Sequence, residues 1–247
     1  MKEKNMIFGI HPVMEAIKEN KEFDKVLIQR DAKGPMLTEL RKLLKEHSIP
    51  SQNLPVQRLN QVSRKNHQGV IAFLSPIAFQ PLDNIVMTLF EEGKNPLILI
   101  LDRVSDVRNF GAICRTAECA GVDAVVVPVK GSAQVSADAV KTSSGALLKI
   151  NLCRERSLQA SVEYLKSSGF KIIGCTEKTG HLMYDGEYTG PTAIIVGSEE
   201  DGISSPLMQL VDIAVKIPLM GEIESLNVSV STAVILYEAI RQRQVFN

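Results

Sequence analysis

The chain has 247 residues, and its 28 Lys and Arg residues balance 28 Asp and Glu residues, so the formal net charge is zero. Hydrophobic residues make up 45% of the sequence, which excludes a disordered chain and is enough for one large or two small domains. No apolar run approaches the roughly 20 residues of a membrane span, and no secretory signal opens the chain, so we expect a cytoplasmic protein. The four cysteines form no C-x-x-C pair and the four histidines lack ligand spacing, which predicts reduced thiols and no metal site.

Residues 1–76 are expected to form a small α/β domain. Its predicted elements, in chain order, are a short strand in "MIFGI", a helix in "HPVMEAIKEN", a strand in "KVLIQR", an amphipathic helix in "MLTELRKLLKEHS", and strands near "LPVQ" and in "GVIAFLS". Residues 1–80 hold 13 Lys and Arg against eight Asp and Glu, whereas residues 81–247 hold 15 against 20. The basic first domain indicates a polyanionic partner.

A linker and a short lead-in helix are expected over residues 77–94, followed by a second domain over residues 95–247. Its predicted strands cover residues 97–102, 124–129, 147–153, 171–176, 192–197 and 214–219. The predicted helices cover residues 109–120, 157–167, 205–210 and 227–242. Several strands are continuous apolar runs, which predicts an α/β fold with a mostly parallel sheet covered on both faces. Ligands bind such sheets beyond the carboxyl ends of the strands, here in the loops after Asp102, Thr176, Gly197 and Leu219.

The helix after the first of these loops carries "NFGAICRTAECAG". Asn109 is predicted to be its N-cap and Gly121 its C-terminal stop. Arg115 lies two residues, about 200 degrees of helix rotation, from the apolar Ile113, so it should point away from the packed face. It is either a solvated surface arginine or a ligand for an anion.

Two further segments carry polar groups at strand ends. In "VGSEEDGIS", Gly197 and Gly202 allow close approach to the backbone, Glu199 is the acid expected to face inward, and Ser204 or Ser205 should cap the next helix. In "GEIESLNVSVSTAVILYEAI", one of Ser225 or Asn227 should cap a helix whose apolar positions are 230, 233, 234, 237 and 240. The missing G-x-G-x-x-G and P-loop patterns disfavour a dinucleotide oxidoreductase or a P-loop NTPase.

Three segments in order, "NFGAICRTAECAG", "VGSEEDGIS" and "IPLMGEIESLNVSVSTAVILYE", resemble the motifs of the SpoU (TrmH-type) RNA ribose 2′-O-methyltransferases of the SPOUT superfamily. They span most of residues 97–242 and are specific as a set. The segments "IFGIHPVMEAI" and "NHQGVIAF" are similar to the substrate-binding domain that many members carry. One departure is "SVSTAV", which is richer in hydroxyl groups than the alanine-rich run of relatives but leaves the matched site positions unchanged.

The resemblance implies a deep trefoil knot in the second domain, which periodicity does not reveal, and an S-adenosyl-L-methionine site formed by three knot loops. The implied cofactor-binding residues are Thr176, Gly197, Gly202, Ile217, Leu226, Asn227 and Val228. The implied catalytic residues are Asn109, Arg115, Glu199, Ser225 and Asn227. We expect Arg115 to bind the target phosphate and stabilise the developing oxyanion, Glu199 to orient Arg115 or an amide group, and Asn109 to brace its loop.

The resemblance also implies an RNA substrate and a homodimer formed through the knot. Members with such a first domain suggest a guanosine ribose of 23S ribosomal RNA, free or in a pre-ribosomal particle. Arg58, Arg64 and Lys65, together with Arg115, are the expected RNA-binding residues. Two alternatives stay open: a transfer RNA ribose methyltransferase, and a non-catalytic knotted scaffold that binds RNA.

Overall fold

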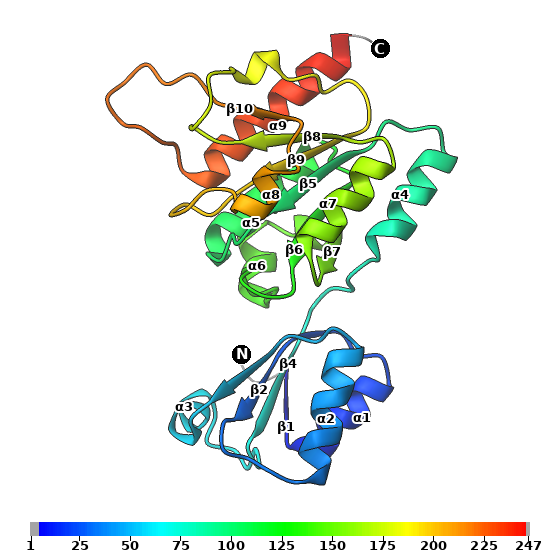
Figure 1. Ribbon diagram of the computed structural model, residues 1–247. Helices are drawn as coiled ribbons and strands as arrows, with labels where there is room; N and C mark the ends of the chain where they lie inside the picture. Colours follow the sequence, from blue (N-terminus) through cyan, green and yellow to red (C-terminus); the bar gives the residue numbers. More distant parts are fainter. Residues whose placement is uncertain (1–4, 246–247) are drawn as a thin grey trace. The chain divides into compact units, whose positions relative to one another are not determined.

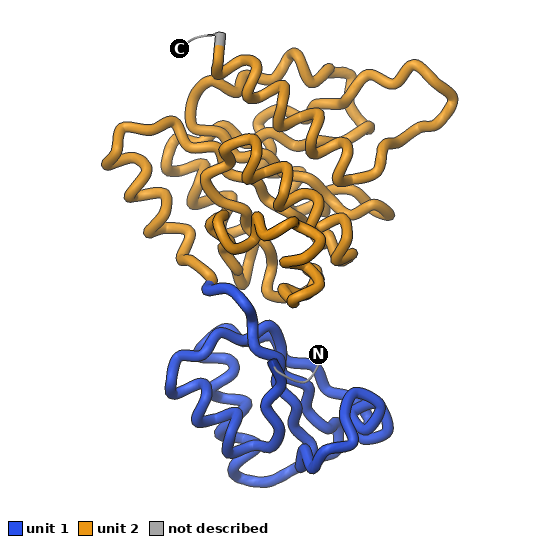
Figure 2. Tube along the Cα trace, turned by 180° about the vertical axis from the view of Figure 1, so that it is seen from behind, with its two compact units in different colours: residues 1–78 blue, residues 79–247 orange. Residues whose placement is uncertain are grey.

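The protein divides into two compact units, residues 1–78 and residues 79–247 (Figure 1; Figure 2). The structure is a computed structural model and describes residues 5–245. Each unit has a sheet and a core of its own.

The first unit is a four-stranded sheet with strand order β1-β4-β2-β3, in which β3 alone pairs in parallel. Its elements are β1 (Met6–Phe8), α1 (Ile10–Lys18), β2 (Phe23–Gln29), α2 (Pro35–Glu46), β3 (Ser51–Leu54), α3 (Val56–Val62) and β4 (Val70–Leu74). Helices α1 and α2 pack their apolar residues onto one face of this sheet. Strand β3 ends at Leu54, so it covers only the first residue of the strand predicted near "LPVQ". Helix α3, which begins at Val56, was not predicted. Pro55 has the fixed backbone angle that suits the start of a helix, and the helical turn brings Leu59 onto the sheet.

The second unit is a six-stranded sheet with order β10-β8-β9-β5-β6-β7, and every pairing in it is parallel. Its strands are β5 (Leu97–Leu101), β6 (Ala124–Pro128), β7 (Asn151–Glu155), β8 (Lys171–Cys175), β9 (Thr192–Val196) and β10 (Ile213–Val215). Its helices are α4 (Leu82–Glu91), α5 (Val107–Cys119), α6 (Ala137–Thr142), α7 (Leu158–Ser167), α8 (Ser205–Met208) and α9 (Val228–Val245), with short 3-10 turns at Ala146–Leu148 and Met183–Asp185. The predicted parallel sheet is confirmed.

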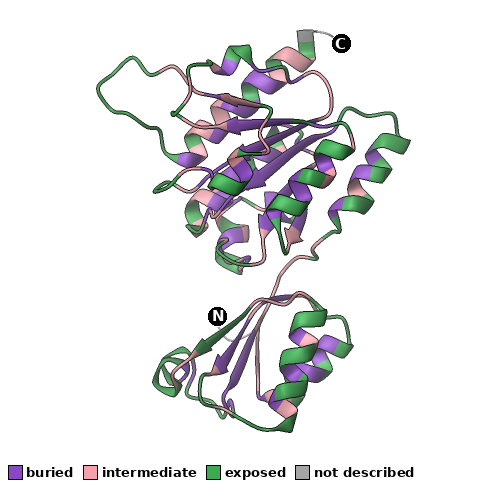
Figure 3. Ribbon diagram, viewed as in Figure 1, coloured by how far each residue is buried: buried purple, intermediate pink, exposed green. Residues whose placement is uncertain are grey.

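Helices cover both faces of this sheet, and its central strands are buried along their whole length (Figure 3). Helices α4, α7 and α8 pack against one face, where Ile98 and Ile100 are fully buried. Helices α5 and α9 lie side by side on the other. Gly111 of α5 has no room for a side chain, because a Cβ there would lie 2.7 Å from Cβ of Thr142. Glycine at this position therefore lets α5 and α6 approach closely.

In the second unit one predicted strand begins later than expected, and one helix was not predicted. The strand predicted from residue 147 begins at Asn151, because Gly145 adopts a left-handed φ of 86° and residues 146–148 form a 3-10 turn. Helix α6 was not predicted, since its six residues are too few for a helical period to show.

Helix α9 buries a different face from the one that its apolar spacing suggests. The predicted stripe is only partly covered, and its members Val230 and Tyr237 are 49% and 54% exposed. The buried positions are Val228, Thr232, Ile235, Leu236, Glu238 and Ala239. The small side chains of Thr232 and Ala239 suit this face to close packing, whereas the more strongly apolar stripe stays partly open.

Candidate functional site

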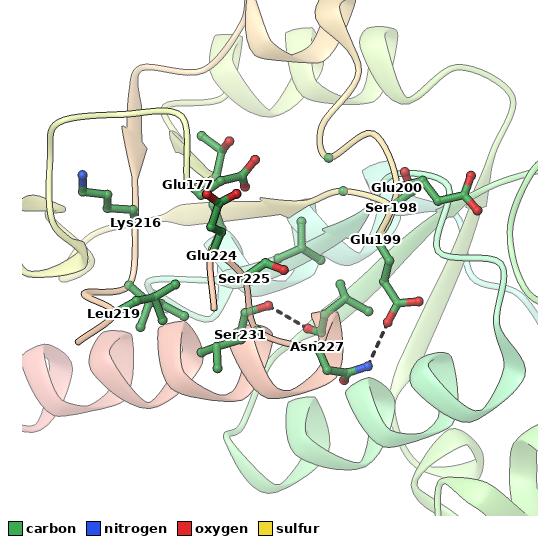
Figure 4. A pocket seen from close by; sticks show the side chains of 18 residues that line it. Glu177, Ser198, Glu199, Glu200, Lys216, Leu219, Glu224, Ser225, Asn227 and Ser231 are labelled. Carbon is green, nitrogen blue, oxygen red and sulfur yellow. Dashed lines mark hydrogen bonds between the residues drawn. The ribbon is translucent and has the colours of Figure 1, made fainter. Parts of the chain in front are cut away.

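A cavity of about 510 Å³ lies at the carboxyl ends of β8, β9 and β10, beside the start of α9 (Figure 4). Four short segments form its wall: the residues after β8, the loop after β9, the residues after β10 and the entry to α9. The lining residues are Cys175, Thr176, Glu177, Val196, Gly197, Ser198, Glu199, Glu200, Gly202, Lys216, Ile217, Leu219, Glu224, Ser225, Leu226, Asn227, Val228 and Ser231.

The structure brings the predicted cofactor-binding residues together in this cavity. All seven line it: Thr176, Gly197, Gly202, Ile217, Leu226, Asn227 and Val228. Among the residues predicted to be catalytic, Glu199 and Ser225 also line it, whereas Asn109 and Arg115 do not. The residues that line the cavity meet because the carboxyl ends of neighbouring parallel strands share one edge of the sheet.

A closed hydrogen-bonded cluster lies at the N-terminal ends of α5 and α9. It consists of Glu199, Asn109 and Asn227. Nδ2 of Asn109 donates to Oε1 of Glu199 over 2.7 Å, and Nδ2 of Asn227 donates to the same oxygen over 2.8 Å. Asn227 also donates to Oδ1 of Asn109 over 3.2 Å. Three segments far apart in the sequence are thereby joined at one carboxylate.

Asn227 also caps α9, as predicted for this position or Ser225. Its Oδ1 accepts the backbone N–H of Ser229 over 3.0 Å and the Ser229 hydroxyl over 2.6 Å. The prediction that Asn109 caps α5 was wrong. Asp106 is the cap, and its Oδ1 accepts the backbone N–H groups of Arg108 and Asn109 over 2.8 and 2.9 Å. Because Asp106 satisfies these amides, the Asn109 side chain can reach Glu199.

Arg115 points away from the packed face of α5, as its spacing from Ile113 predicted, and it is exposed. Within residues 5–245 its side chain makes no hydrogen bond or ion pair, and it does not contact Glu199. The cluster around Glu199 therefore orients amide groups and not this guanidinium.

The loop after β9 is closed tightly on itself. The backbone N–H of Ser198 donates to the Gly202 carbonyl over 3.2 Å, and the Gly202 N–H donates back to Ser198 over 3.0 Å. A Cβ on Gly197 would lie 2.0 Å from the carbonyl carbon of Gly202, and Gly202 has a left-handed φ of 71°. Both positions therefore require glycine for the loop to keep this shape.

Arg103 and Asp102, at the end of β5, hold this loop from outside the cavity. Arg103 donates to Oδ2 of Asp201 over 2.8 Å and to the Gly202 carbonyl over 3.0 Å. Oδ2 of Asp102 accepts the backbone N–H of Ser204 over 2.7 Å. Ser204 occupies the N-cap position of α8, as predicted, but its side chain makes no capping bond. Sequence reasoning missed Arg103, although its place directly after a strand end was a usable signal.

The cavity is predominantly acidic, with one lysine against several carboxylates. Glu177 and Glu224 were not predicted to be site residues. Glu177 follows the predicted Thr176, and Glu224 precedes the predicted Ser225. The charged residues along its wall are Glu177, Glu199, Glu200, Glu224 and Lys216 (Figure 4). Burial raises the pKa of Cys175 to about 12, so its thiol is neutral and is no nucleophile. Such a lining suits a ligand with positive charge.

The predicted RNA-binding residues of the first unit lie on α3 and the loop after it. Arg58 and Arg64 are exposed, and Arg58 donates to Oε1 of Gln61 over 3.3 Å. Lys65 places its ammonium group 5.5 Å from the ring centre of Phe8. Arg64 and Lys65 line one shallow hollow with polar residues of α3.

Neither a metal-binding cluster nor a membrane-spanning helix is found within the described part of the chain. Residues 5–245 hold no group of three or more His, Cys, Asp or Glu side chains placed to bind a metal ion. None of the helices described there is long and apolar enough to span a bilayer.

A parallel sheet with a cavity formed by loops at its carboxyl edge places the second unit among α/β ligand-binding proteins, and comparison with known families identifies the family. The SpoU rRNA Methylase family matches residues 96–237, and the RNA 2′-O ribose methyltransferase substrate binding family matches residues 6–80. The chain belongs to the SpoU rRNA Methylase family. The resemblance drawn from the three motifs is confirmed.

Relatives match over nearly the whole chain. The 23S rRNA (guanosine-2′-O-)-methyltransferase RlmB of Photobacterium profundum is 36% identical, covering 98% of this chain and 99% of that protein. A putative TrmH family tRNA/rRNA methyltransferase of Staphylococcus saprophyticus is 34% identical, covering 98% and 97%. Among solved structures, the SpoU methyltransferase AviRb of Streptomyces viridochromogenes in complex with AdoMet superposes with a TM-score of 0.61 at 25% identity, covering 97% of this chain and 90% of AviRb.

Proposed function

We propose that this chain transfers the methyl group of S-adenosyl-L-methionine to the 2′-hydroxyl of a guanosine ribose in 23S ribosomal RNA, free or in an assembling ribosomal particle. The observation that carries the proposal is the meeting of three motif segments at one cavity, with Glu199 joined to Asn109 and Asn227. Membership of the SpoU family and the full-length similarity to an RlmB support the same reaction and substrate.

The cavity fits S-adenosyl-L-methionine in size and chemistry. Its volume of about 510 Å³ is within the range of small-ligand sites. Gly197 lets the loop close against Gly202 and keep the shape that lines the cavity, and Leu226 and Ile217 offer apolar contact for an adenine. The surrounding carboxylates suit the cationic sulfonium and amino groups. When bound there, the cofactor supplies an electrophilic methyl group.

The residues around the cavity would orient the RNA ribose and stabilise charge. Arg115 binds the phosphate of the target nucleotide and stabilises the oxyanion that develops as the 2′-hydroxyl loses its proton to water or a phosphate oxygen. Glu199 holds the amides of Asn109 and Asn227 in place. Ser225, which lines the cavity beside them, would fix the loop. A guanidinium keeps its proton in proteins, so Arg115 acts as a cation and not as a base. Near-normal activity of Arg115→Lys, which keeps the charge but loses the planar fork, would contradict this role.

The trefoil knot remains a proposal that several contacts support. After β8 the chain forms a long loop that bonds to β10 on one side: the backbone N–H of Lys216 donates to His181 over 3.0 Å, and that of Met183 donates to Lys216 over 2.8 Å. The same loop bonds to the last turns of α9, where Nε2 of Gln242 donates to the Gly186 carbonyl over 3.0 Å. The chain from β10 to α9 would thus pass through this loop.

A homodimer is proposed on the strength of α9. Its apolar stripe, which includes Val230 and Tyr237, is not buried by the rest of the described chain. Leu219 and Leu226 of the neighbouring loop are also partly exposed, at 38% and 40%. A second copy would cover these surfaces, and each exposed Arg115 would then lie near the boundary between two active sites.

The RNA would be held in part by the basic first unit. Arg58, Arg64 and Lys65 are placed on one exposed segment and would neutralise phosphates. Unpaired RNA is the fitting target, because a ribose 2′-hydroxyl in a bulge or loop can enter a cavity. A transfer RNA substrate is the second candidate, since the relative from Staphylococcus saprophyticus carries both RNA classes in its name.

The deciding experiment is methyl transfer from radiolabelled S-adenosyl-L-methionine to undermethylated 23S ribosomal RNA and to transfer RNA, with nuclease mapping of the labelled nucleoside. We expect labelled 2′-O-methylguanosine in 23S RNA. Label only in transfer RNA would replace the substrate and keep the chemistry. Cofactor binding with no label in either RNA, or in ribosomal particles, would overturn the enzyme and leave an RNA-binding scaffold.

A further inference from the structure

The sheet of the first unit has one covered face and one largely open face. Helices α1 and α2 cover the first (Figure 1). The helix on the second face is α3, and its Leu59 packs on Leu27 and Ile71 of the sheet. Beside this small cluster, Phe8 of β1 and Phe73 of β4 are only partly buried. An aromatic surface therefore remains on strands that no helix covers completely.

Each of these two rings faces a lysine. The Lys25 ammonium lies 5.4 Å from the centre of the Phe73 ring, and the Lys65 ammonium lies 5.5 Å from that of Phe8. Both are cation–π contacts made by long, flexible side chains. Part of each aromatic ring is therefore covered by a flexible lysine side chain and not by residues of the core.

The two rings lie on adjacent strands of the same face. Phe73 is paired with Met6, and Phe8 is paired with Ile71, so Phe8 and Phe73 are diagonal neighbours of an antiparallel pair. Such diagonal positions are separated by about 7–8 Å, within reach of aromatic side chains. Two neighbouring bases of an extended strand could contact both rings.

The segment that contains β3, α3 and β4 carries charge of one sign. Residues 47–82, which include β3, α3 and β4, contain Arg58, Arg64 and Lys65 and no Asp or Glu. The loop before β4 is held in shape by His67, whose Nδ1 accepts the Gly69 N–H over 3.1 Å. Cations and uncovered aromatic rings together match a polyanion that carries planar groups.

We propose that the open sheet face of the first unit binds unpaired nucleotides of the substrate RNA, with bases stacked on Phe8 and Phe73 and phosphates paired with Lys25, Lys65 and Arg64. A base takes the place of the ammonium over each ring, and the displaced ammonium pairs with the adjoining phosphate. This inference rests on the proposed RNA substrate and names the form of RNA that the first unit recognises.

The first test uses the full chain and the variants Phe8→Leu, Phe73→Leu and the double variant. Three probes are compared: a single-stranded oligoadenylate of about twelve nucleotides, a fully paired RNA duplex of the same length, and inorganic polyphosphate. We expect each substitution to weaken oligoadenylate binding roughly fivefold to tenfold and to leave polyphosphate binding unchanged, because only the bases stack. Unchanged oligoadenylate affinity in the double variant would overturn the proposal.

Tryptophan fluorescence gives a second test that keeps an aromatic ring at the site. The chain contains no tryptophan, so Phe73→Trp introduces a single reporter. The matched control is Phe90→Trp, because Phe90 is 38% exposed on α4 of the other unit. Oligoadenylate should quench the indole fluorescence of the Phe73→Trp variant and leave that of the Phe90→Trp variant unaffected. Equal quenching in both variants, or in neither, would contradict stacking on this face.

Methyl transfer separates this inference from the proposed function. In the Phe8→Leu, Phe73→Leu double variant we expect KM for 23S RNA to rise at least fivefold while the affinity for S-adenosyl-L-methionine is unchanged. An unchanged KM for RNA would show that the face contacts something else, such as a protein, and would overturn this inference alone. Loss of methyl transfer in the unsubstituted protein would instead refute the proposed function, with the quenching test still decisive for the sheet face.

Discussion

At the scale of single residues, Glu199 is the point where the three motif segments are joined. One carboxylate oxygen accepts N–H groups from Asn109 at the start of α5 and Asn227 at the start of α9. Hydrogen bonds to a charged acceptor are stronger than those between neutral groups. Glu199 itself belongs to the loop whose backbone lines the cavity. Its charge therefore helps to set the cavity's shape.

Replacing Glu199 by Gln should lower the affinity of the cavity for S-adenosyl-L-methionine without unfolding the protein. The amide oxygen keeps one acceptor but loses the charge, and we expect a loss of about 1.5 kcal/mol, roughly tenfold, in affinity for S-adenosyl-L-methionine. Isothermal titration calorimetry measures this affinity. The matched control is Glu222→Gln, an exposed acid of the same region that does not line the cavity. Equal effects of both substitutions would show that only general charge matters.

Gly197 permits a contact that no other residue allows. Alanine there would place its Cβ 2.0 Å from the Gly202 carbonyl carbon, so the loop must open. We expect Gly197→Ala to reduce cofactor affinity by more than tenfold, corresponding to about 2 kcal/mol of strain. Gly180→Ala is the control, because nothing lies within 4 Å of a Cβ at that position. Cofactor binding of Gly197→Ala at the level of Gly180→Ala would disprove the requirement.

At the scale of elements, the last turns of α9 fasten the long loop between β8 and β9. Arg243 donates four hydrogen bonds to backbone carbonyls, those of Asn95, Pro96, Tyr188 and Gly190. One turn earlier, the buried Glu238 accepts a two-pronged contact from Arg241 with both distances 2.8 Å. The arginine fork satisfies carbonyls from two separate segments at once. This helix end therefore stabilises the loop that approaches the cavity.

Arg243→Met should destabilise the second unit. It keeps much of the aliphatic stem but removes four hydrogen bonds from a charged donor, although the carbonyls of Pro96, Tyr188 and Gly190 each keep a second bond, from Thr192. We expect a loss of about 2–3 kcal/mol in the free energy of unfolding. Thermal unfolding followed by circular dichroism should show a Tm lower by about 5 °C or more. Arg108→Met, at an exposed position of α5 whose side chain makes no hydrogen bond within the described residues, should leave Tm within about 1 °C. A Tm for Arg243→Met that equals this control would refute the fastening role.

At the scale of the whole molecule, the stripe on α9 determines how the chain should behave in solution. Val230 and Tyr237 are large, apolar and about half exposed, seven residues apart on the same side of one helix. The opposite side of α9 is packed within the chain. An exposed apolar stripe is typical of an interaction surface, and the homodimer that we propose would bury it.

A charge placed on that stripe should separate the proposed dimer. We expect a double variant, Val230→Glu with Tyr237→Glu, to change the mass measured by size-exclusion chromatography with light scattering from two chains to one. Met87→Glu is the control, since Met87 is 57% exposed on α4, away from α9. Two chains in the stripe variant, or one chain in the unsubstituted protein, would show that α9 is not the dimer surface.

The sequence by itself determined the parallel sheet and the place of the cavity. The continuous apolar runs of β5, β6 and β9 are typical of strands buried on both faces, and the strand-end rule then pointed to the loops after Asp102, Thr176, Gly197 and Leu219. The last three of these loops line the cavity, whereas the loop after Asp102 does not. Both inferences hold because they depend on local composition and on a general property of parallel sheets. The roles of the individual site residues stay predictions.

Only the tertiary structure decided which of several suitable groups makes each contact. Asp106 and Asn109 both suit an N-cap, but in the structure Asp106 caps α5, and the Asn109 amide donates to Glu199, ninety residues away. The apolar spacing of α9 predicted one stripe, but the structure buries another side of the helix, which includes Thr232 and Ala239. Arg103 finds Asp201 only after β5 and β9 pair. Local sequence encodes propensity and pattern, but the partner of a polar side chain is set by segments that folding brings together.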